Sequence, residues 1–299
     1  MGEKSPPVIS TDDLLIIIVA TLMGTLARYM TLRLDYRQYP SHPNGRMIHL
    51  VVGFIAAAIG AVAIPAIKSN NFTAVTFLAL AIQNFRDVRK SERESLKDLE
   101  TTEFTPRGNA YIDGIAKTFE SRNYFALIVS LVTATTMESA KYLGLFPKTI
   151  LGVVLGYAAF YFISHYSKGK TVGDISSIRE AKIEVRNTEL YVENIFISNL
   201  LGTENAQKLI SEEGIAVIIE PTDNDLRIAL ENYGQRQAIL FEATRTFGIK
   251  RYHFTRRDFS TGKVVICFVP IINDVDRLLA VVKNTPLLES VKKSPAVMN

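Results

Sequence analysis

Two aspartates that stand beside glycines are the residues with which this sequence could do chemistry. Asp113 lies in an Asp-Gly step together with Tyr111 and Gly114, and Asp174 follows Gly173. Two carboxylates that share one proton can serve as acid and base toward a water molecule, because two close like charges cannot both ionise. Such a pair could hydrolyse an amide. Aspartate is also common in turns and at helix caps, so a purely structural role stays open for each.

Glu138 is the other candidate, because it lies where an apolar segment turns polar. An ionisable group at membrane depth suggests function, although a glutamate satisfied at the interface, beside Lys141, is the structural alternative. Arg28 near the end of the first apolar segment poses the same choice between reaching the interface and being buried for function. These two charges are the basis of a third hypothesis, transport.

Other chemistry finds little support. Cys267 is the single cysteine and sits in an apolar run, which predicts a buried thiol rather than a nucleophile. His42 and His49 are seven residues apart without a carboxylate partner, so we expect no metal site. The segments 260–263 (STGK) and 169–174 (GKTVGD) lack the full phosphate-loop pattern, so we expect no nucleotide and no other cofactor.

The positioning elements divide the chain into two halves. Apolar residues crowd into residues 14–165, which predicts about five transmembrane helices in a membrane domain over residues 1–167. The net charge is +4, and the basic residues cluster between apolar segments, which favours a lipid bilayer and not nucleic acid as the partner. The expected spans are 14–32, 48–67, 72–85, 124–136 and 149–163. Segment 48–67 is rich in small residues, so we expect it to pack against another helix, and 72–85 is shorter than a full span.

The lysines and arginines of the connections predict an orientation. The first connection holds three and the third holds eight, whereas the second holds one and the fourth two. Because basic loops stay in the cytosol, we expect the N-terminus outside and the C-terminal half in the cytosol. The third connection, residues 86–123, reads as a charged helix, a break near Arg107-Gly108, and an amphipathic segment along the membrane face.

Residues 168–299 read as a soluble α+β domain with helices on one sheet. Alternating runs predict β-hairpins over 182–194 and 252–269, and a buried strand over 215–220. Helical patterns cover the remainder of this half: 199–213, ending before Gly214, then 224–248 and 274–282.

Residues 111–116 (YIDGIA) resemble the motif that names the YIEGIA family of membrane proteins of endospore-forming Firmicutes. The resemblance extends through 37–46 (RQYPSHPNGR), 71–81 (NFTAVTFLALA) and 234–240 (GQRQAIL). Asp113 stands where the family name has glutamate. The carboxylate is kept, but the aspartate side chain is shorter, so a role that needs the length of glutamate is in doubt. The resemblance implies an integral membrane protein of sporulating cells, without implying a reaction.

Two functions follow as hypotheses. Asp113 and Asp174 fall at the expected cytosolic membrane edge, which is similar to membrane aspartyl proteases, although Thr171 replaces the first glycine of their usual motif. The first hypothesis is therefore a membrane-bound aspartic-type protease acting on a protein substrate at the cytosolic face. The alternative is a non-enzymatic membrane scaffold or sensor whose cytosolic domain recruits a sporulation partner.

Overall fold

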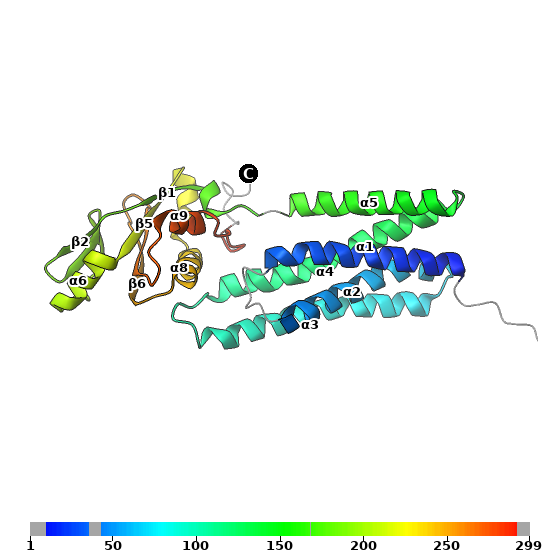
Figure 1. The fold of residues 1–299 in the computed structure, drawn as a ribbon, viewed down its shortest axis with the longest axis horizontal. Helices are drawn as coiled ribbons and strands as arrows, with labels where there is room; N and C mark the ends of the chain where they lie inside the picture. Colours follow the sequence, from blue (N-terminus) through cyan, green and yellow to red (C-terminus); the bar gives the residue numbers. More distant parts are fainter. Residues whose placement is uncertain (1–9, 36–42, 168, 292–299) are drawn as a thin grey trace, which may run out of the picture. The chain divides into compact units, whose positions relative to one another are not determined.

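The structure, a computed structural model, describes residues 10–35, 43–167 and 169–291. Its contacts divide the chain into two compact units (Figure 1). The helical unit consists of residues 1–93 and 115–168, and the C-terminal unit of residues 94–114 and 169–299. Residues 94–114, from the connection that the sequence places with the membrane half, therefore group with the C-terminal residues.

Five long helices occupy the first part of the described chain. Three of them are long and apolar enough to cross a membrane, over Thr11–Leu32, Met47–Lys68 and Leu145–Tyr166. The helices that contain the other two expected spans, 72–85 and 124–136, are not among these three, so the expected count of five is supported for three segments. The helices are α1 (Thr11–Asp35), α2 (Pro43–Lys68), α3 (Phe72–Glu100), α4 (Asn109–Ser139) and α5 (Leu145–Tyr166).

Small residues let these helices approach closely. Gly60 of α2 lies against the backbone carbonyl of Leu127 on α4. The Ser130 hydroxyl donates a hydrogen bond to the Ala57 carbonyl at 2.6 Å. The expectation that 48–67 packs against another helix is thus confirmed, since a larger side chain at Gly60 would push α4 away.

Arg28 is buried among these helices. Only 1% of its surface is exposed, and its guanidinium lies 5.9 Å from the centre of the Phe119 ring. Gly53 on α2 leaves room for the aliphatic part of the side chain. The side chain is therefore buried within the helical unit, and a role of Arg28 in transport stays a prediction.

Helices α3 and α4 are longer than the sequence predicts. The charged segment that begins at residue 86 continues α3 without a break to Glu100, because no glycine or proline interrupts it. The amphipathic segment 111–124 and the apolar segment 124–136 likewise form one helix, α4. Each of these two helices has residues in both units.

The C-terminal unit contains helices and two antiparallel sheets, so the expected single sheet is wrong. Strands β1 (Ser176–Glu180), β5 (Ile215–Pro221), β7 (Val264–Val269) and β6 (Arg251–Arg257) form a four-stranded sheet in that order. Strands β2 (Ile183–Arg186), β3 (Glu189–Val192) and β4 (Ile195–Ser198) form a three-stranded sheet. Both predicted hairpins, β2–β3 and β6–β7, are confirmed.

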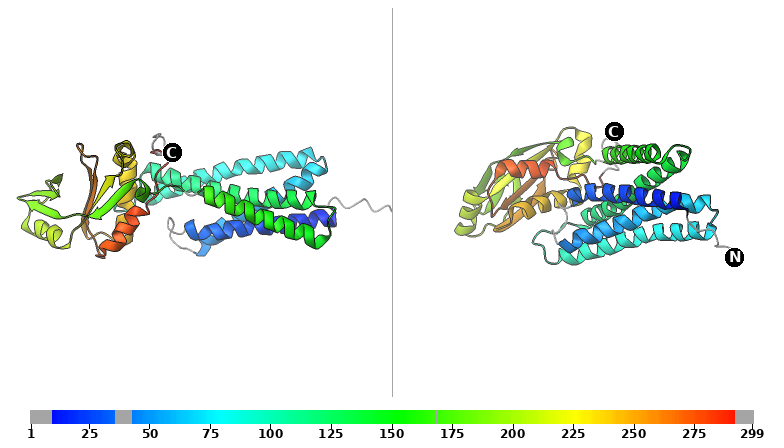
Figure 2. Two further views of the ribbon diagram at one scale, coloured as in Figure 1. Left: turned by 90° about the horizontal axis from the view of Figure 1, so that it is seen from above. Right: turned by 45° about the vertical axis from the view of Figure 1, so that its right-hand side comes forward.

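Helices cover both faces of the four-stranded sheet. Ala216, Ile218 and Cys267 point to one face, where they pack with β3, β4 and α6 (Glu204–Glu213). Side chains alternate along a strand, so the neighbouring residues point to the other face. Figures 1 and 2 show α8 (Tyr233–Phe247) and α9 (Val275–Lys283) on that side. Cys267 is fully buried as predicted, and burial raises the pKa of its thiol to about 12.

The helix predicted over 224–248 is interrupted. It consists of the 3-10 turn η2 (Asn224–Leu226), the short α7 (Arg227–Glu231) and α8. Asn232 separates α7 from α8, and its side-chain oxygen accepts a hydrogen bond from the Gln235 amide at 3.2 Å. An asparagine is a favourable N-cap, so it starts a new helix here.

Candidate functional site

The segment that carries Tyr111 packs on α8 within the C-terminal unit. Tyr111 is 3% exposed, and its hydroxyl donates a hydrogen bond to the Glu242 carboxylate on α8 at 2.5 Å. Its ring meets the ring of Phe241 edge-on, with the centroids 6.2 Å apart. The first turn of α4 is thereby fixed to α8 by one polar and one aromatic contact.

The electrostatics of this contact keep Tyr111 protonated. Burial, followed by the negative charge of Glu242, raises the pKa of Tyr111 well above its usual 10. Arg245 donates a second hydrogen bond to Glu242 at 3.0 Å. Tyr111 is therefore a hydrogen-bond donor that holds two segments together, and not a nucleophile.

The connection between α3 and α4 is closed by side chains of the same unit. The Glu100 carboxylate accepts hydrogen bonds from the backbone amides of Arg107 and Gly108. Gly108 has a φ of +86°, a conformation that favours glycine. Gln237 of α8 donates a hydrogen bond to the Pro106 carbonyl at 2.7 Å. We call residues 100–111, with the α8 residues that they touch, the α8 junction.

Arg107 places a positive charge inside the α8 junction. It is 4% exposed and lies 4.8 Å over the ring of Phe241. Its Nη2 donates to Glu103 at 3.0 Å, whereas Nε and Nη1 have no hydrogen-bond partner among the described residues. A buried guanidinium stacked on an aromatic ring supplies both packing and cation–π attraction.

The two aspartates occupy different elements. Asp113 lies in α4, two residues after Tyr111, and Asp174 ends the 3-10 turn η1 (Val172–Asp174). The Asp174 carboxylate accepts hydrogen bonds from the Thr171 amide at 2.7 Å and from the Thr171 hydroxyl at 3.0 Å. This is the capping role that the sequence leaves open for Asp174. Pairing of the two carboxylates in catalysis stays a prediction.

The remaining candidates are Gly114, Gly173 and Glu138. A Cβ at Gly114 would meet no described atom within 4 Å, whereas one at Gly173 would collide with the side chain of Lys283. Glu138 belongs to the other end of α4, in the helical unit, where it lies 3.2 Å from Lys68. Lys68 also pairs with Asp13 at 3.2 Å. Glu138 is thus satisfied by a cation, and that cation is Lys68.

Sequence reasoning missed three residues of the α8 junction: Arg107, Gln237 and Glu242. It counts Arg107 only as a basic loop residue. Gln237 falls in the run 234–240, which the family resemblance includes, and it donates to Pro106, five residues before Tyr111 of the other motif. Membership of both runs in the family resemblance was the one signal that could have suggested that these parts of the chain lie near each other.

The fold and the site define a class: a protein with three long apolar helices and an α+β unit that includes the connection between two further helices, α3 and α4. The chain belongs to the YIEGIA family: the model of this family, described as "YIEGIA protein", matches residues 16–298.

A relative is "Uncharacterized protein YphB" of Bacillus subtilis (strain 168). It is 35% identical over 292 residues, which cover 95% of this chain and 96% of that protein. No solved structure matches the chain.

Proposed function

We propose that the chain is a membrane-anchored scaffold or sensor whose C-terminal unit recruits a protein partner on the cytosolic side of a sporulating cell. The observation that carries this proposal is the α8 junction. It makes the connection between α3 and α4 a part of the C-terminal unit, through Tyr111 with Glu242 and Gln237 with Pro106.

Three helices supply the anchor. Along α5, Ile150, Val154 and Tyr161 are 62%, 55% and 65% exposed, whereas Gly152 and Gly156 are buried against other helices. A stripe of exposed large apolar residues beside buried glycines suits a helix with lipid on one side and protein on the other.

The junction supplies a route between anchor and partner. Because α3 and α4 each have residues in both units, a displacement of the segment 101–108 acts directly on the ends of two helices. A helix transmits such a displacement along its axis, since its backbone hydrogen bonds resist bending. A scaffold needs only the anchoring, whereas a sensor would also use this route.

The location and the cellular context of the proposal rest on the charge pattern and on the family. The basic residues between the apolar segments favour a cytosolic C-terminal unit. The sporulation context rests on the family and on the Bacillus relative.

The scaffold reading is tested by cross-linking in the organism that encodes the chain. The tagged full chain, an Asp113→Asn/Asp174→Asn variant and a deletion of residues 169–299 are compared by mass spectrometry during sporulation. We expect one set of cross-linked proteins with the first two and its loss with the deletion. An identical set from the deletion would exclude recruitment by the C-terminal unit.

The same experiment addresses the protease hypothesis. An aspartic-type protease with Asp113 and Asp174 as acid and base would leave its substrate uncleaved in the double variant. Accumulation of one longer protein in that variant, with unchanged cross-links, would favour catalysis over scaffolding. The hydrogen bonds from Thr171 to Asp174 already give that carboxylate a capping role, which is why the scaffold is preferred.

Orientation has its own test. Because Cys267 is fully buried, a Lys208→Cys change on the exposed side of α6 adds the reactive thiol that a membrane-impermeant maleimide would find. We expect labelling only after protoplasts are permeabilised. Labelling of intact protoplasts would place the C-terminal unit outside and contradict the proposal.

A further inference from the structure

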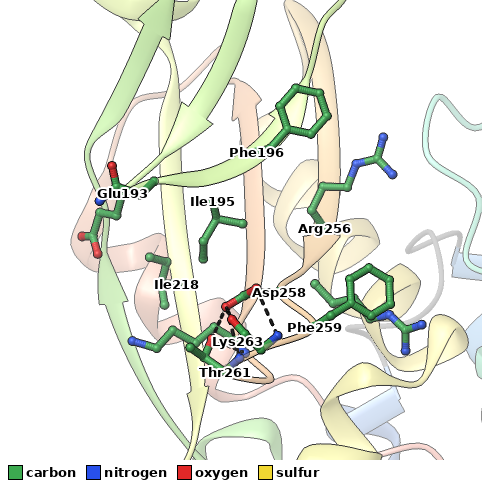
Figure 3. Close-up of a pocket in the computed structure, with 12 residues that line it drawn as sticks. Glu193, Ile195, Phe196, Ile218, Arg256, Asp258, Phe259, Thr261 and Lys263 are labelled. Carbon is green, nitrogen blue, oxygen red and sulfur yellow. Dashed lines mark hydrogen bonds between the residues drawn. The ribbon is translucent and has the colours of Figure 1, made fainter.

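A cavity of about 550 Å³ opens between β4 and the β6–β7 hairpin of the C-terminal unit (Figure 3). It lies on the face of the four-stranded sheet that β4 covers, since Ile218 of β5 belongs to its lining and to that core. Its volume falls in the range of small-molecule sites, roughly 300–1,000 Å³. We call it the hairpin pocket.

The hairpin pocket has an apolar lining with two aromatic rings that remain open to solvent. Ile195 and Ile218 contribute aliphatic surface, and Phe196 and Phe259 are 45% and 73% exposed. In Figure 3 the two rings and Arg256 lie on one side of Ile195 and Ile218. Exposed phenylalanines around a concavity are unfavourable in water and favour an apolar or aromatic ligand.

The charged residues of the lining other than Arg256 are held by neighbouring groups. Asp258 is held by the hairpin turn itself, because its carboxylate accepts hydrogen bonds from the amides and hydroxyls of Ser260 and Thr261. Most other charged residues of the lining have a partner of opposite charge: Glu193 with Arg179, Arg257 with Glu231 at 3.1 Å, and Lys263 with Glu220 at 3.0 Å.

Arg256 is the exception. Its Nε donates to the backbone carbonyl of Ile197 at 2.8 Å, which fixes the plane of the guanidinium. For Nη1 and Nη2 the described part of the chain provides no acceptor, and no carboxylate there forms an ion pair with Arg256. The guanidinium therefore offers two nitrogens without an acceptor in the described chain, on the side of the pocket where Phe196 and Phe259 lie (Figure 3).

The turn that borders the pocket is built to hold its shape. Arg227 donates hydrogen bonds to the carbonyls of Phe259 and Ser260, and Gly262 has a φ of +72° with the Arg227 side chain packed against it. Pre-organisation of this kind lowers the entropy that a ligand would otherwise have to remove on binding.

We propose that the hairpin pocket binds a small amphipathic anion, in which an aromatic or aliphatic body contacts Phe196 and Phe259 and a carboxylate or phosphate group pairs with Arg256. This ligand would be the signal of the proposed sensor, so its consequence rests on that function. Binding itself is measured on the chain alone, without a partner, and therefore succeeds or fails separately.

The chain contains no tryptophan, so Phe259→Trp places a single indole beside the pocket. The purified full-length variant is titrated in detergent micelles with 4-nitrobenzoate, with 4-nitrophenyl phosphate and with neutral 4-nitrobenzyl alcohol, all of which quench indole fluorescence. We expect saturable quenching by at least one anion and about ten- to hundredfold weaker binding of the alcohol, as for a hydrogen-bonded charge. The tighter of the two anions identifies the head group.

Three further variants in the same background assign the binding to Arg256. Arg256→Gln should weaken binding of the anion to the level of the alcohol, and Arg256→Lys, which keeps the charge but not the paired donors, should give an intermediate value. Arg251→Gln is the matched control, because it removes the same charge from an exposed position at the other end of β6, outside the lining. Circular dichroism establishes that each variant is folded.

Two results would overturn the proposal. One is quenching that rises linearly with all three probes, which indicates collision and not binding. The other is saturable binding that Arg256→Gln and Arg256→Lys both leave unchanged while the proteins remain folded.

Discussion

The α8 junction and the hairpin pocket belong to the same unit, but Tyr111 and Gln237 of the junction are buried, whereas Arg256 of the pocket is exposed. In the junction, the buried Tyr111 donates a hydrogen bond to Glu242 of α8, and the buried Gln237 of α8 donates one to the Pro106 carbonyl. In the pocket, Arg256 keeps two donors for which the described chain offers no acceptor, beside the exposed ring of Phe259. Polar groups satisfied inside a protein specify its architecture, whereas pre-oriented spare donors in a concave surface are available to a ligand. Substitutions should therefore affect stability in the first region and binding in the second.

The largest expected effect is that of Tyr111→Ala in the junction. Removing a buried aromatic side chain costs about 3 to 5 kcal/mol. Tyr111→Phe, which removes only the hydroxyl, should cost about 1 kcal/mol because Arg245 still satisfies Glu242. Thermal unfolding of the full chain in micelles, followed by circular dichroism, measures both.

Tyr233→Ala is the control for this series, because Tyr233 is 69% exposed on the same helix and should change the unfolding free energy by less than about 0.5 kcal/mol. Equal losses for Tyr111→Ala and Tyr233→Ala would mean that the junction does not hold the C-terminal unit together.

Two glycines with positive φ, one in each region, give the next largest effect. Gly108→Ala and Gly262→Ala each force a left-handed conformation on a residue with a Cβ, at about 1 to 2 kcal/mol. Gly262→Ala should in addition displace Arg227 and so weaken probe binding in the pocket. Gly108→Ala should lower stability alone.

Probe titrations on both proteins, at a temperature where each is folded, test this distinction. A loss of probe binding in Gly108→Ala as large as that in Gly262→Ala would show that the two regions are not independent.

The acid stability of the pocket turn gives a smaller effect. Hydrogen bonds from Thr261 and Ser260 lower the pKa of Asp258 from 3.8 to about 2. A lowered folded pKa contributes stability above pH 3.8, and that contribution is lost as the pH falls toward 2. Because this turn is partly exposed, we expect only about 1 kcal/mol.

Unfolding of the full chain and of Asp258→Asn is compared between about pH 5 and pH 2. The variant should be less stable at pH 5 and should converge with the parent near pH 2, when Asp258 is protonated in both states. Curves that stay parallel over this range would assign the lowered pKa no role in stability.

The sequence predicts local structure well, and it misses contacts between residues that are far apart in the chain. The hairpins were predictable because alternating strands flank turn residues such as Asn187 and Gly262, both of which adopt positive φ. The α8 junction was not, because its hydrogen bond joins residues 131 positions apart and leaves no periodic pattern.

The membrane half shows the same limit. Small residues in 48–67 predicted close packing correctly, as Gly60 demonstrates, yet hydrophobicity alone placed Arg28 at an interface as readily as in the interior. The Arg28 side chain can be buried because Gly53, on another helix, leaves space for it. That information lies in the pairing of helices and not in one segment. Asp174 is a comparable case in the C-terminal unit. The sequence allows a capping role for this residue, but only the structure shows that Thr171 is its partner.

The smallest expected effect on stability is that of Arg256→Gln, and this makes it the sharpest test of the comparison. Within the described residues its one side-chain hydrogen bond is that to Ile197, at a partly exposed site, so the unfolding free energy should fall by about 0.5 to 1 kcal/mol. Affinity for the anionic probe should fall by about ten- to hundredfold in the same protein. Tyr111→Phe provides the reverse case, with a similar loss of stability and unchanged probe affinity. If instead both variants lose affinity in proportion to their loss of stability, the pocket depends on the fold as a whole, and its spare donors would have no separate purpose.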